Sequence, residues 1–195
     1  GLFFRLDASN VLEKNIASII MPIGIDHKDF LKEGTVDEIV YEKCSHLLEG
    51  SKIFVSEQKN DVIEKIKNNI SSNSSEKFVF GENYEYKKNA DGFVYRDKLG
   101  EINLPFPNLL GDFQISNVST AIATSRNLDR FKITKANIKL AITKIRSEGR
   151  LQTITRGKLR KYVFKDNKIL IDGAHNSLAA LAVKKYLETF DKERK

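Results

Sequence analysis

The sequence predicts an α/β protein with three parts. These are a parallel sheet with helices on both faces, a small antiparallel meander, and the start of a second, Rossmann-like α/β domain. Three observations support this. Two apolar runs before residue 58 are each followed by a helical pattern, the rhythm of a parallel sheet. Short alternating segments separated by glycines follow, which is typical of a meander. Near the end, an apolar run is followed by a polar turn and another helical pattern.

The first half of the chain supplies the parallel part. Ile16–Ile25 is a continuous apolar run and predicts a buried strand. Thr35 and Glu38 have capping-box spacing and open a helix to about residue 48. Ser51–Glu57 predicts the next strand, and Asn60 is expected to cap a helix to about residue 70.

The middle of the chain changes pattern. Segments between about residues 77 and 104 alternate and predict the meander. Helices are expected at 112–128 and 134–145, because each has an apolar stripe: Val118, Ala121, Ile122 and Ser125 in one, and Ile138, Ala141, Ile142 and Ile145 in the other. The expected domains are therefore 1–147, a linker at 148–158, and a truncated C-terminal domain at 159–195. That last domain is expected to open with a hairpin of 160–164 and 168–171.

The motif Asp172-Gly-Ala-His-Asn176 lies between a predicted strand and a helix that Ser177 is expected to cap. The carboxyl end of a strand facing the amino end of a helix is where open α/β sheets bind ligands, and helix amino ends favour anions. Asp172, His175 and Asn176 are therefore candidate binding residues. A polar corner without function is an equally good interpretation of this motif alone.

Lys43 is the most unusual residue of the first half. Val36, Ile39, Val40 and Leu47 form an apolar helical stripe, and the spacing places Lys43 on the same face. A lysine there must reach water along its stem, pair with an anion, or be chemically altered.

Composition excludes several classes of protein. Cys44 is the only cysteine, which rules out a disulfide framework and favours a reducing, cytoplasmic location. No apolar run is long enough to span a membrane, and a membrane partner is not expected. The net charge is +7, but a nucleic-acid partner is not expected either, because no basic cluster is interleaved with exposed aromatic residues.

Six segments, taken in order, resemble the dihydrofolate synthase/folylpolyglutamate synthase family, a branch of the Mur ligase superfamily. They are Arg5-Leu-Asp-Ala-Ser-Asn10, Ile23-Gly-Ile-Asp-His27, Glu42-Lys43, Leu110-Gly-Asp-Phe-Gln-Ile-Ser-Asn117, Gly149-Arg-Leu-Gln152 and Asp172-Gly-Ala-His-Asn176. The resemblance spans nearly the whole chain. It departs from the family at Phe3-Phe4, Phe113 and Ser147-Glu148, where the family usually has Gly-Gly, His and Trp-Pro.

The resemblance implies an enzyme, an ATP-dependent ligase that joins L-glutamate to a pteroate or folate carboxylate through an acyl phosphate. Its substrates would be folate or dihydropteroate and glutamate, with ATP and Mg²⁺. It implies that His27 binds magnesium and that Lys43 is carbamylated and catalytic. Other implied roles are a nucleotide site of Gln114, Asn117, Arg150, Asp172 and His175, with His175 also catalytic, and a substrate-side motif of Arg5, Asp7 and Asn10.

The sequence contains no G-x-x-x-x-G-K-[ST] phosphate loop. We therefore expect an internal fragment of such a ligase that is inactive alone, and a separate chain could supply the phosphate loop. Two alternatives stay open. One is another Mur-type amide ligase, acting on a peptidoglycan precursor. The other is a non-catalytic remnant that binds only nucleotide or a partner.

Overall fold

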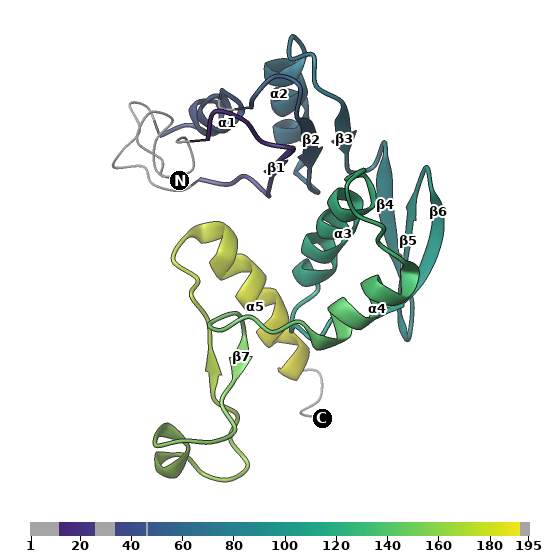
Figure 1. Ribbon diagram of the computed structural model, residues 1–195. Coiled ribbons are helices and arrows are strands. Elements are labelled where there is room, and N and C mark those ends of the chain that lie inside the picture. Colours follow the sequence, from purple (N-terminus) through teal and green to yellow (C-terminus); the bar gives the residue numbers. More distant parts are fainter. Residues whose placement is uncertain (1–11, 26–33, 46, 192–195) are drawn as a thin grey trace.

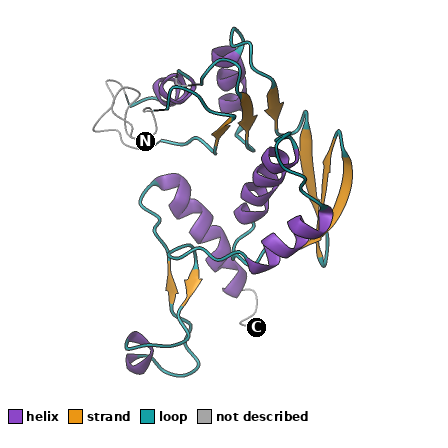
Figure 2. Cartoon of the chain, viewed as in Figure 1, coloured by secondary structure: helices purple, strands orange, loops and turns teal. Residues whose placement is uncertain are grey.

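The structure is a computed structural model that describes residues 12–25, 34–45 and 47–191. The described residues form a three-stranded parallel sheet, a three-stranded antiparallel sheet, a two-stranded sheet and five α-helices (Figures 1 and 2). This confirms the predicted fold class. No helix in the described part is long and apolar enough to cross a membrane.

The parallel sheet has the order β1-β2-β3, with β1 at Ala17–Ile20, β2 at Lys52–Val55 and β3 at Lys77–Val79. Helices α1 (Val36–Cys44) and α2 (Asn60–Ile70) cover one face. Because side chains alternate along a strand, Ile53 and Val55 point to this face and pack with Ile39, Val40, Val62 and Ile66.

The other face of the same sheet is covered by α3 (Phe113–Arg126). Phe54 and Phe78 lie on neighbouring strands and their rings stack with centroids 4.6 Å apart. They form one core with Ile115, Val118 and Ile122 of α3 and with the apolar side chains of the antiparallel sheet. The expectation of helices on both faces is therefore confirmed.

The antiparallel sheet is a meander of β4 (Tyr84–Lys88), β5 (Gly92–Asp97) and β6 (Gly100–Pro105). The expected start at about residue 77 was wrong, because Lys77–Val79 pairs in parallel with β2. Helix α4 (Lys135–Lys144) packs beside β6 and begins with a capping box between Thr134 and Asn137.

Helix α3 differs from its expected stripe. It lies between the parallel sheet and the meander, so it is buried on several sides (Figure 1). Ala121, an expected core residue, is exposed, while the polar Ser119 and Thr120 are fully buried. Thr120 Oγ1 compensates by donating to the Ser116 carbonyl oxygen at 3.1 Å.

Two other local expectations need correction. Asn60 does not cap α2: Lys59 occupies the cap position and makes no side-chain bond there. Strand β1 was expected to be buried, but it is an edge strand of the described sheet, and Ile16 and Ile19 are exposed.

The last part of the described chain holds β7 (Gln152–Thr153), the 3₁₀ helix η3 (Leu159–Tyr162), β8 (Leu170–Ile171) and α5 (Ser177–Asp191). Strand β8 pairs antiparallel with β7, so the expected hairpin of 160–164 with 168–171 was wrong. Every residue of 152–190 is described, and none of these side chains is buried.

Candidate functional site

The start of α3 meets the segment that connects α4 to β7. Leu151 is only 2% exposed. Gly111 precedes α3 with φ +94°, and a Cβ there would lie 2.4 Å from Phe113 Cε1 and 3.1 Å from Leu151 Cδ1. Glycine is thus required at 111 both by its backbone angle and by the closeness of these two side chains. Two of the six family-like segments, those of Gly111 and Leu151, therefore lie in contact.

Leu151 is also hydrogen-bonded to another of the six family-like segments, Asp172-Gly-Ala-His-Asn176. Its φ of +46° is a left-handed backbone conformation that is uncommon for leucine. The Leu151 backbone N–H donates to Asp172 Oδ2 at 2.7 Å, and the Gly173 N–H donates to the Gly149 carbonyl oxygen at 2.7 Å. These two bonds hold the segment at residue 150 against the carboxyl end of β8.

Both carboxylate oxygens of Asp172 accept hydrogen bonds from backbone N–H groups. Oδ1 accepts from the Ala174 N–H at 2.8 Å, while Oδ2 accepts from Leu151. Asp172 therefore determines the conformation of its own turn and the position of Leu151. The Arg150 side chain is exposed beside this turn, and its Nη1 would lie 3.5 Å from a Cβ placed on Gly173.

His175 and Asn176 connect this turn to α5. His175 Nδ1 lies 2.9 Å from the Gly173 carbonyl oxygen, which orients the exposed imidazole. Asn176 Oδ1 accepts from the Ala179 N–H at 2.8 Å, so Asn176 is the cap of α5 and the expected cap Ser177 is the first helical residue.

Gln114 and Asn117 lie on the first turns of α3. Asn117 Nδ2 donates to Gln114 Oε1 at 3.1 Å, and the Gln114 side chain is buried. Both predicted nucleotide residues thus lie on the helix that begins two residues after Gly111, the glycine that Leu151 approaches.

The carboxyl end of the parallel sheet is also close to α5. A Cβ on Gly24, four residues after β1, would lie 3.0 Å from Leu178 Cβ in the first turn of that helix. The segment before Gly24 is held by Gln58, whose Oε1 accepts from the Ile23 N–H at 2.9 Å and whose Nε2 donates to the Met21 carbonyl oxygen at 3.0 Å. The sequence analysis missed Gln58, and no local pattern marks it, because its partners are 35 and 37 residues away.

Lys43 does not lie on the buried stripe. Its side chain is exposed, and Cys44 takes the buried position beside Ile39 and Val40. Burial raises the pKa of the Cys44 thiol to about 11, so it is protonated at neutral pH. Whether Lys43 has a catalytic role stays a prediction.

The remaining predicted site residues, His27, Arg5, Asp7 and Asn10, lie outside the described residues. Within the described part, no group of three His, Cys, Asp or Glu side chains could hold a metal ion. The described residues alone therefore do not fit a metal centre, and we derive no chemical step through one.

The arrangement suits an anionic ligand. The amino end of the 15-residue helix α5 carries a partial positive charge and backbone N–H donors. The Arg150 guanidinium adds a full charge close to the turn that precedes this helix.

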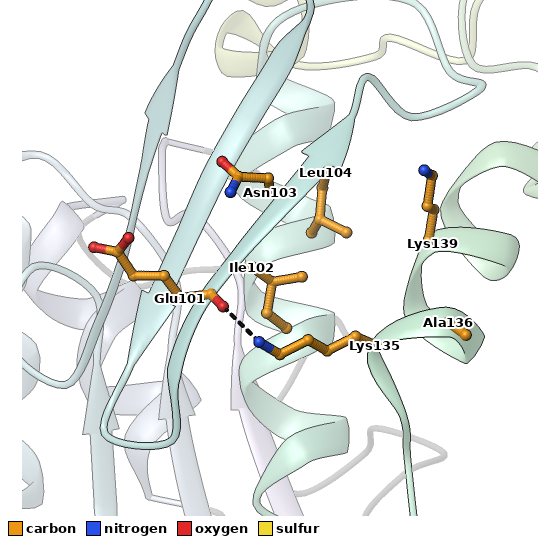
Figure 3. Close-up of a pocket in the computed structure, with 7 residues that line it drawn as sticks. All are labelled: Glu101, Ile102, Asn103, Leu104, Lys135, Ala136 and Lys139. Carbon is orange, nitrogen blue, oxygen red and sulfur yellow. Dashed lines mark hydrogen bonds between the residues drawn. The ribbon is translucent and has the colours of Figure 1, made fainter.

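A cavity of about 340 Å³ lies between β6 and α4, away from these residues (Figure 3). None of its lining residues is a predicted site residue, and Lys135 Nζ reaches across it to the Glu101 carbonyl oxygen at 3.0 Å.

Comparison with known proteins gives relatives of one kind. No protein-family model matches the chain. It is 29% identical over 204 aligned residues to dihydrofolate synthase/folylpolyglutamate synthase of Buchnera aphidicola subsp. Schizaphis graminum, covering 99% of this chain and 42% of the relative. It is 30% identical to dihydrofolate synthetase of Saccharomyces cerevisiae, covering 96% of this chain and 44% of that protein.

Solved structures share the fold of this chain. An FPGS–AMPPCP–folate complex superimposes with a TM-score of 0.82 at 22% identity, covering 97% of this chain and 46% of that one. E. coli FolC in complex with DHPP and ADP gives a TM-score of 0.79 at 23% identity, with 97% and 42% covered.

The architecture thus defines an α/β protein with the fold of the folylpolyglutamate synthases. The curated relatives add the closer assignment: the chain is homologous to dihydrofolate synthase/folylpolyglutamate synthase. It spans less than half the length of the curated relatives it matches.

Proposed function

We propose that this chain is part of an ATP-dependent ligase that joins L-glutamate to the carboxylate of a pteroate or folate. In the proposed reaction the carboxylate attacks the γ-phosphate of ATP and releases ADP. The glutamate amine then displaces phosphate from the acyl phosphate and forms the amide. The same proposal includes Mg²⁺ as the metal and a cytoplasmic location. It also divides the chain into a domain at 1–147, a linker at 148–158 and a second domain at 159–195.

One observation carries the proposal. Three segments that resemble the family's motifs lie far apart in sequence, yet they are joined by the Gly111–Leu151 contact and the Leu151–Asp172 hydrogen bond. The curated relatives along nearly the whole chain support the same function. The proposal assigns Gln114, Asn117, Arg150, Asp172 and His175 to the nucleotide.

Their proposed roles follow from their positions. Arg150 and the amino end of α5 would neutralise phosphate charge, while Asp172 would keep the turn in place through its two backbone bonds. The exposed imidazole of His175 would face the phosphates. Lys43 and His27 would act on the reacting groups from the first half of the chain.

The test is ATP binding by the purified chain, measured by isothermal titration calorimetry with the non-hydrolysable analogue AMPPCP. We expect Arg150→Ala to weaken binding about tenfold, which corresponds to ~1.4 kcal/mol. Arg130→Ala removes another exposed arginine outside the site and is expected to leave affinity unchanged.

Ligase activity is measured separately, as incorporation of radiolabelled glutamate into dihydropteroate or folate. We expect none from this chain without a polypeptide that supplies a phosphate loop. Absence of AMPPCP binding, or equal loss in the Arg150→Ala and Arg130→Ala variants, would contradict the proposed nucleotide site.

A further inference from the structure

A strongly basic loop extends from the β7–β8 pair, and we call residues 156–168 the basic arm. It is the olive segment that carries η3 and points away from both larger sheets (Figure 1). Its six basic side chains are opposed by one acidic side chain, Asp166. The six are Arg156, Lys158, Arg160, Lys161, Lys165 and Lys168. The net charge per residue is therefore far more positive in the basic arm than in the chain as a whole.

The basic arm has a defined conformation. Arg160 Nη1 donates to the Phe164 carbonyl oxygen at 3.0 Å and to the Asn167 carbonyl oxygen at 2.9 Å, and its Nη2 donates to the Lys165 carbonyl oxygen. The Asn167 N–H donates to the Phe164 carbonyl oxygen at 3.0 Å. Arg160 thus donates hydrogen bonds to backbone carbonyl groups within the loop and closes it on itself.

Two aromatic rings are presented by this closed loop. Tyr162 is 87% exposed and Phe164 is 84% exposed. Val163 between them has φ −125° and ψ 140°, an extended conformation. Tyr162 ends η3 and Phe164 follows this extended residue, so two exposed rings lie within three consecutive residues of the loop.

The surrounding cations are not neutralised. In the described part of the chain, no acidic side chain forms an ion pair with Arg156, Lys158, Lys161 or Lys165, all of which are exposed. Lys168 instead lies over the Phe190 ring of α5, 4.8 Å from its centroid. Exposed cations without acidic partners create a positive potential available to an anionic ligand.

A nucleic-acid partner was not expected from the sequence, because no basic cluster was interleaved with exposed aromatic residues. The separate expectation of a hairpin strand at 160–164 was wrong, and the 3₁₀ helix and loop found there carry Tyr162 and Phe164, 87% and 84% exposed, among basic residues. The basic arm therefore has the interleaved cations and exposed rings that were not expected.

We propose that the basic arm binds single-stranded nucleic acid. Bases would stack on Tyr162 and Phe164, and Lys158, Lys161 and Lys165 would contact the phosphates. Stacking on a ring tolerates any base, so the expected binding is not sequence-specific. The arm contains none of the residues assigned to the ligase site, and this inference does not depend on the proposed ligase function.

A lipid surface fits the same loop less well. A membrane-inserting loop gathers its apolar side chains, because each charge taken into the hydrocarbon is costly. In the basic arm, Arg160 and Lys161 separate Leu159 from Tyr162, and Lys165 directly follows Phe164. Burying either ring in lipid would bring an adjacent ammonium group with it, whereas phosphates between stacked bases suit this alternation.

The test is fluorescence anisotropy with a labelled single strand of about 12 nucleotides of mixed sequence. We expect a dissociation constant on the order of 10 µM at low salt. The Tyr162→Ala/Phe164→Ala double variant should weaken binding at least tenfold, because stacking contributes roughly 1–3 kcal/mol per base. The matched control Tyr41→Ala/Phe131→Ala removes rings that are 61% and 58% exposed elsewhere, and affinity should not change.

A second measurement tests the phosphate contacts. In Lys158→Ala/Lys161→Ala, the slope of log affinity against log salt should decrease by about 1.4, since each single-strand phosphate contact contributes about 0.7. Lys132→Ala/Lys139→Ala removes two exposed lysines outside the arm and should leave the slope unchanged. Unaltered melting curves and AMPPCP affinity in all four variants would confirm that the fold and the ligase site are intact.

Three results would overturn the proposal. One is equal affinity in the aromatic double variant and the unmodified chain. Another is equal loss in the arm and control variants, which would indicate general charge attraction. In the last, the Tyr162→Ala/Phe164→Ala variant loses binding to phosphatidylserine/phosphatidylcholine vesicles but binds the single strand as well as the unmodified chain does. That result would assign the arm to a membrane surface.

Discussion

Arg126 and Asp97 form a buried ion pair that joins α3 to β5. Arg126 Nε donates to Asp97 Oδ2 at 2.8 Å and Nη2 donates to Oδ1 at 3.0 Å, and the two side chains are only 7% and 2% exposed. The Tyr95 hydroxyl donates to Asp97 Oδ2 at 3.0 Å. Burial and the neighbouring Asp97 carboxylate raise the pKa of Tyr95 far above its ordinary value.

This ion pair predicts a large effect of removing one partner alone. Asp97→Asn should lower the free energy of unfolding by about 3–5 kcal/mol, because it leaves the Arg126 charge buried and uncompensated. The double change Asp97→Leu/Arg126→Met should cost less than either single change. Urea denaturation measures the unfolding free energies of Asp97→Asn, Arg126→Met and the double variant. Arg96→Met, which breaks an exposed pair with Glu101, is the control and should change little. A double variant less stable than both single variants would count against this account.

Cys44 predicts a loss of stability at alkaline pH. Burial raises the pKa of its thiol from 9.0 to about 11, so the folded state binds the proton more tightly than the unfolded chain does. The resulting stabilisation is complete below pH 9 and disappears as the pH rises from about 9 to about 11. Cys44→Ala should therefore show a shallower fall of unfolding free energy over this window. Identical slopes in both proteins would exclude Cys44 as the cause.

The Asp172 carboxylate should protect two backbone amides, those of Leu151 and Ala174, from hydrogen exchange. Asp172→Ala removes the acceptor of the Leu151 and Ala174 N–H groups, and both should exchange about tenfold faster in hydrogen-exchange NMR. Asp172→Asn keeps one side-chain carbonyl oxygen and should retain protection at one of the two. His175→Ala alters the same turn without removing either acceptor, so both amides should remain protected. Unchanged exchange in Asp172→Ala would disprove this role of the carboxylate.

The close contact between Gly24 and Leu178 should help to hold the first turn of α5 in place. A Cβ on Gly24 would lie 3.0 Å from Leu178 Cβ, so Gly24→Val should push the first turn of α5 away from the segment that follows β1. Hydrogen exchange of the amides from Leu178 to Leu187 should become faster. Ile25→Val changes the exposed neighbouring residue by one methyl group and should have no such effect. Equal protection of α5 in both variants would mean that this contact does not hold the helix.

The elements of this fold were largely predictable because their patterns are local. The alternation of apolar runs and helical stripes gave the parallel sheet and its covering helices. The one-residue error at Lys43 shows the limit of this approach. Lys43 and Cys44 differ by about 100° around a helix, and the four stripe residues could not decide which of them points inward. Packing against Ile53 and Val55 decides it in favour of Cys44.

The features that could not be predicted from the sequence depend on particular hydrogen bonds, some of them to groups far away along the chain. Gln58 matters through backbone groups 35 and 37 residues away, which no pattern around Gln58 records. The segment 160–164 alternates like a strand, but Arg160 binds the carbonyl groups of 164, 165 and 167 and bends the chain into a loop. Asn176 and Ser177 are both good helix caps, and only the observed bond to the Ala179 N–H distinguishes them.

The placement of α3 between two sheets has a consequence for how the protein unfolds. Phe54 and Phe78 of the parallel sheet and Phe93 and Tyr95 of the meander belong to one continuous core around this helix. Neither sheet can separate without exposing the apolar surface that α3 shares with the other. A fluorophore on β2 and another on β5 should therefore report the same denaturation midpoint, and a chemical denaturant should melt both sheets in a single cooperative transition.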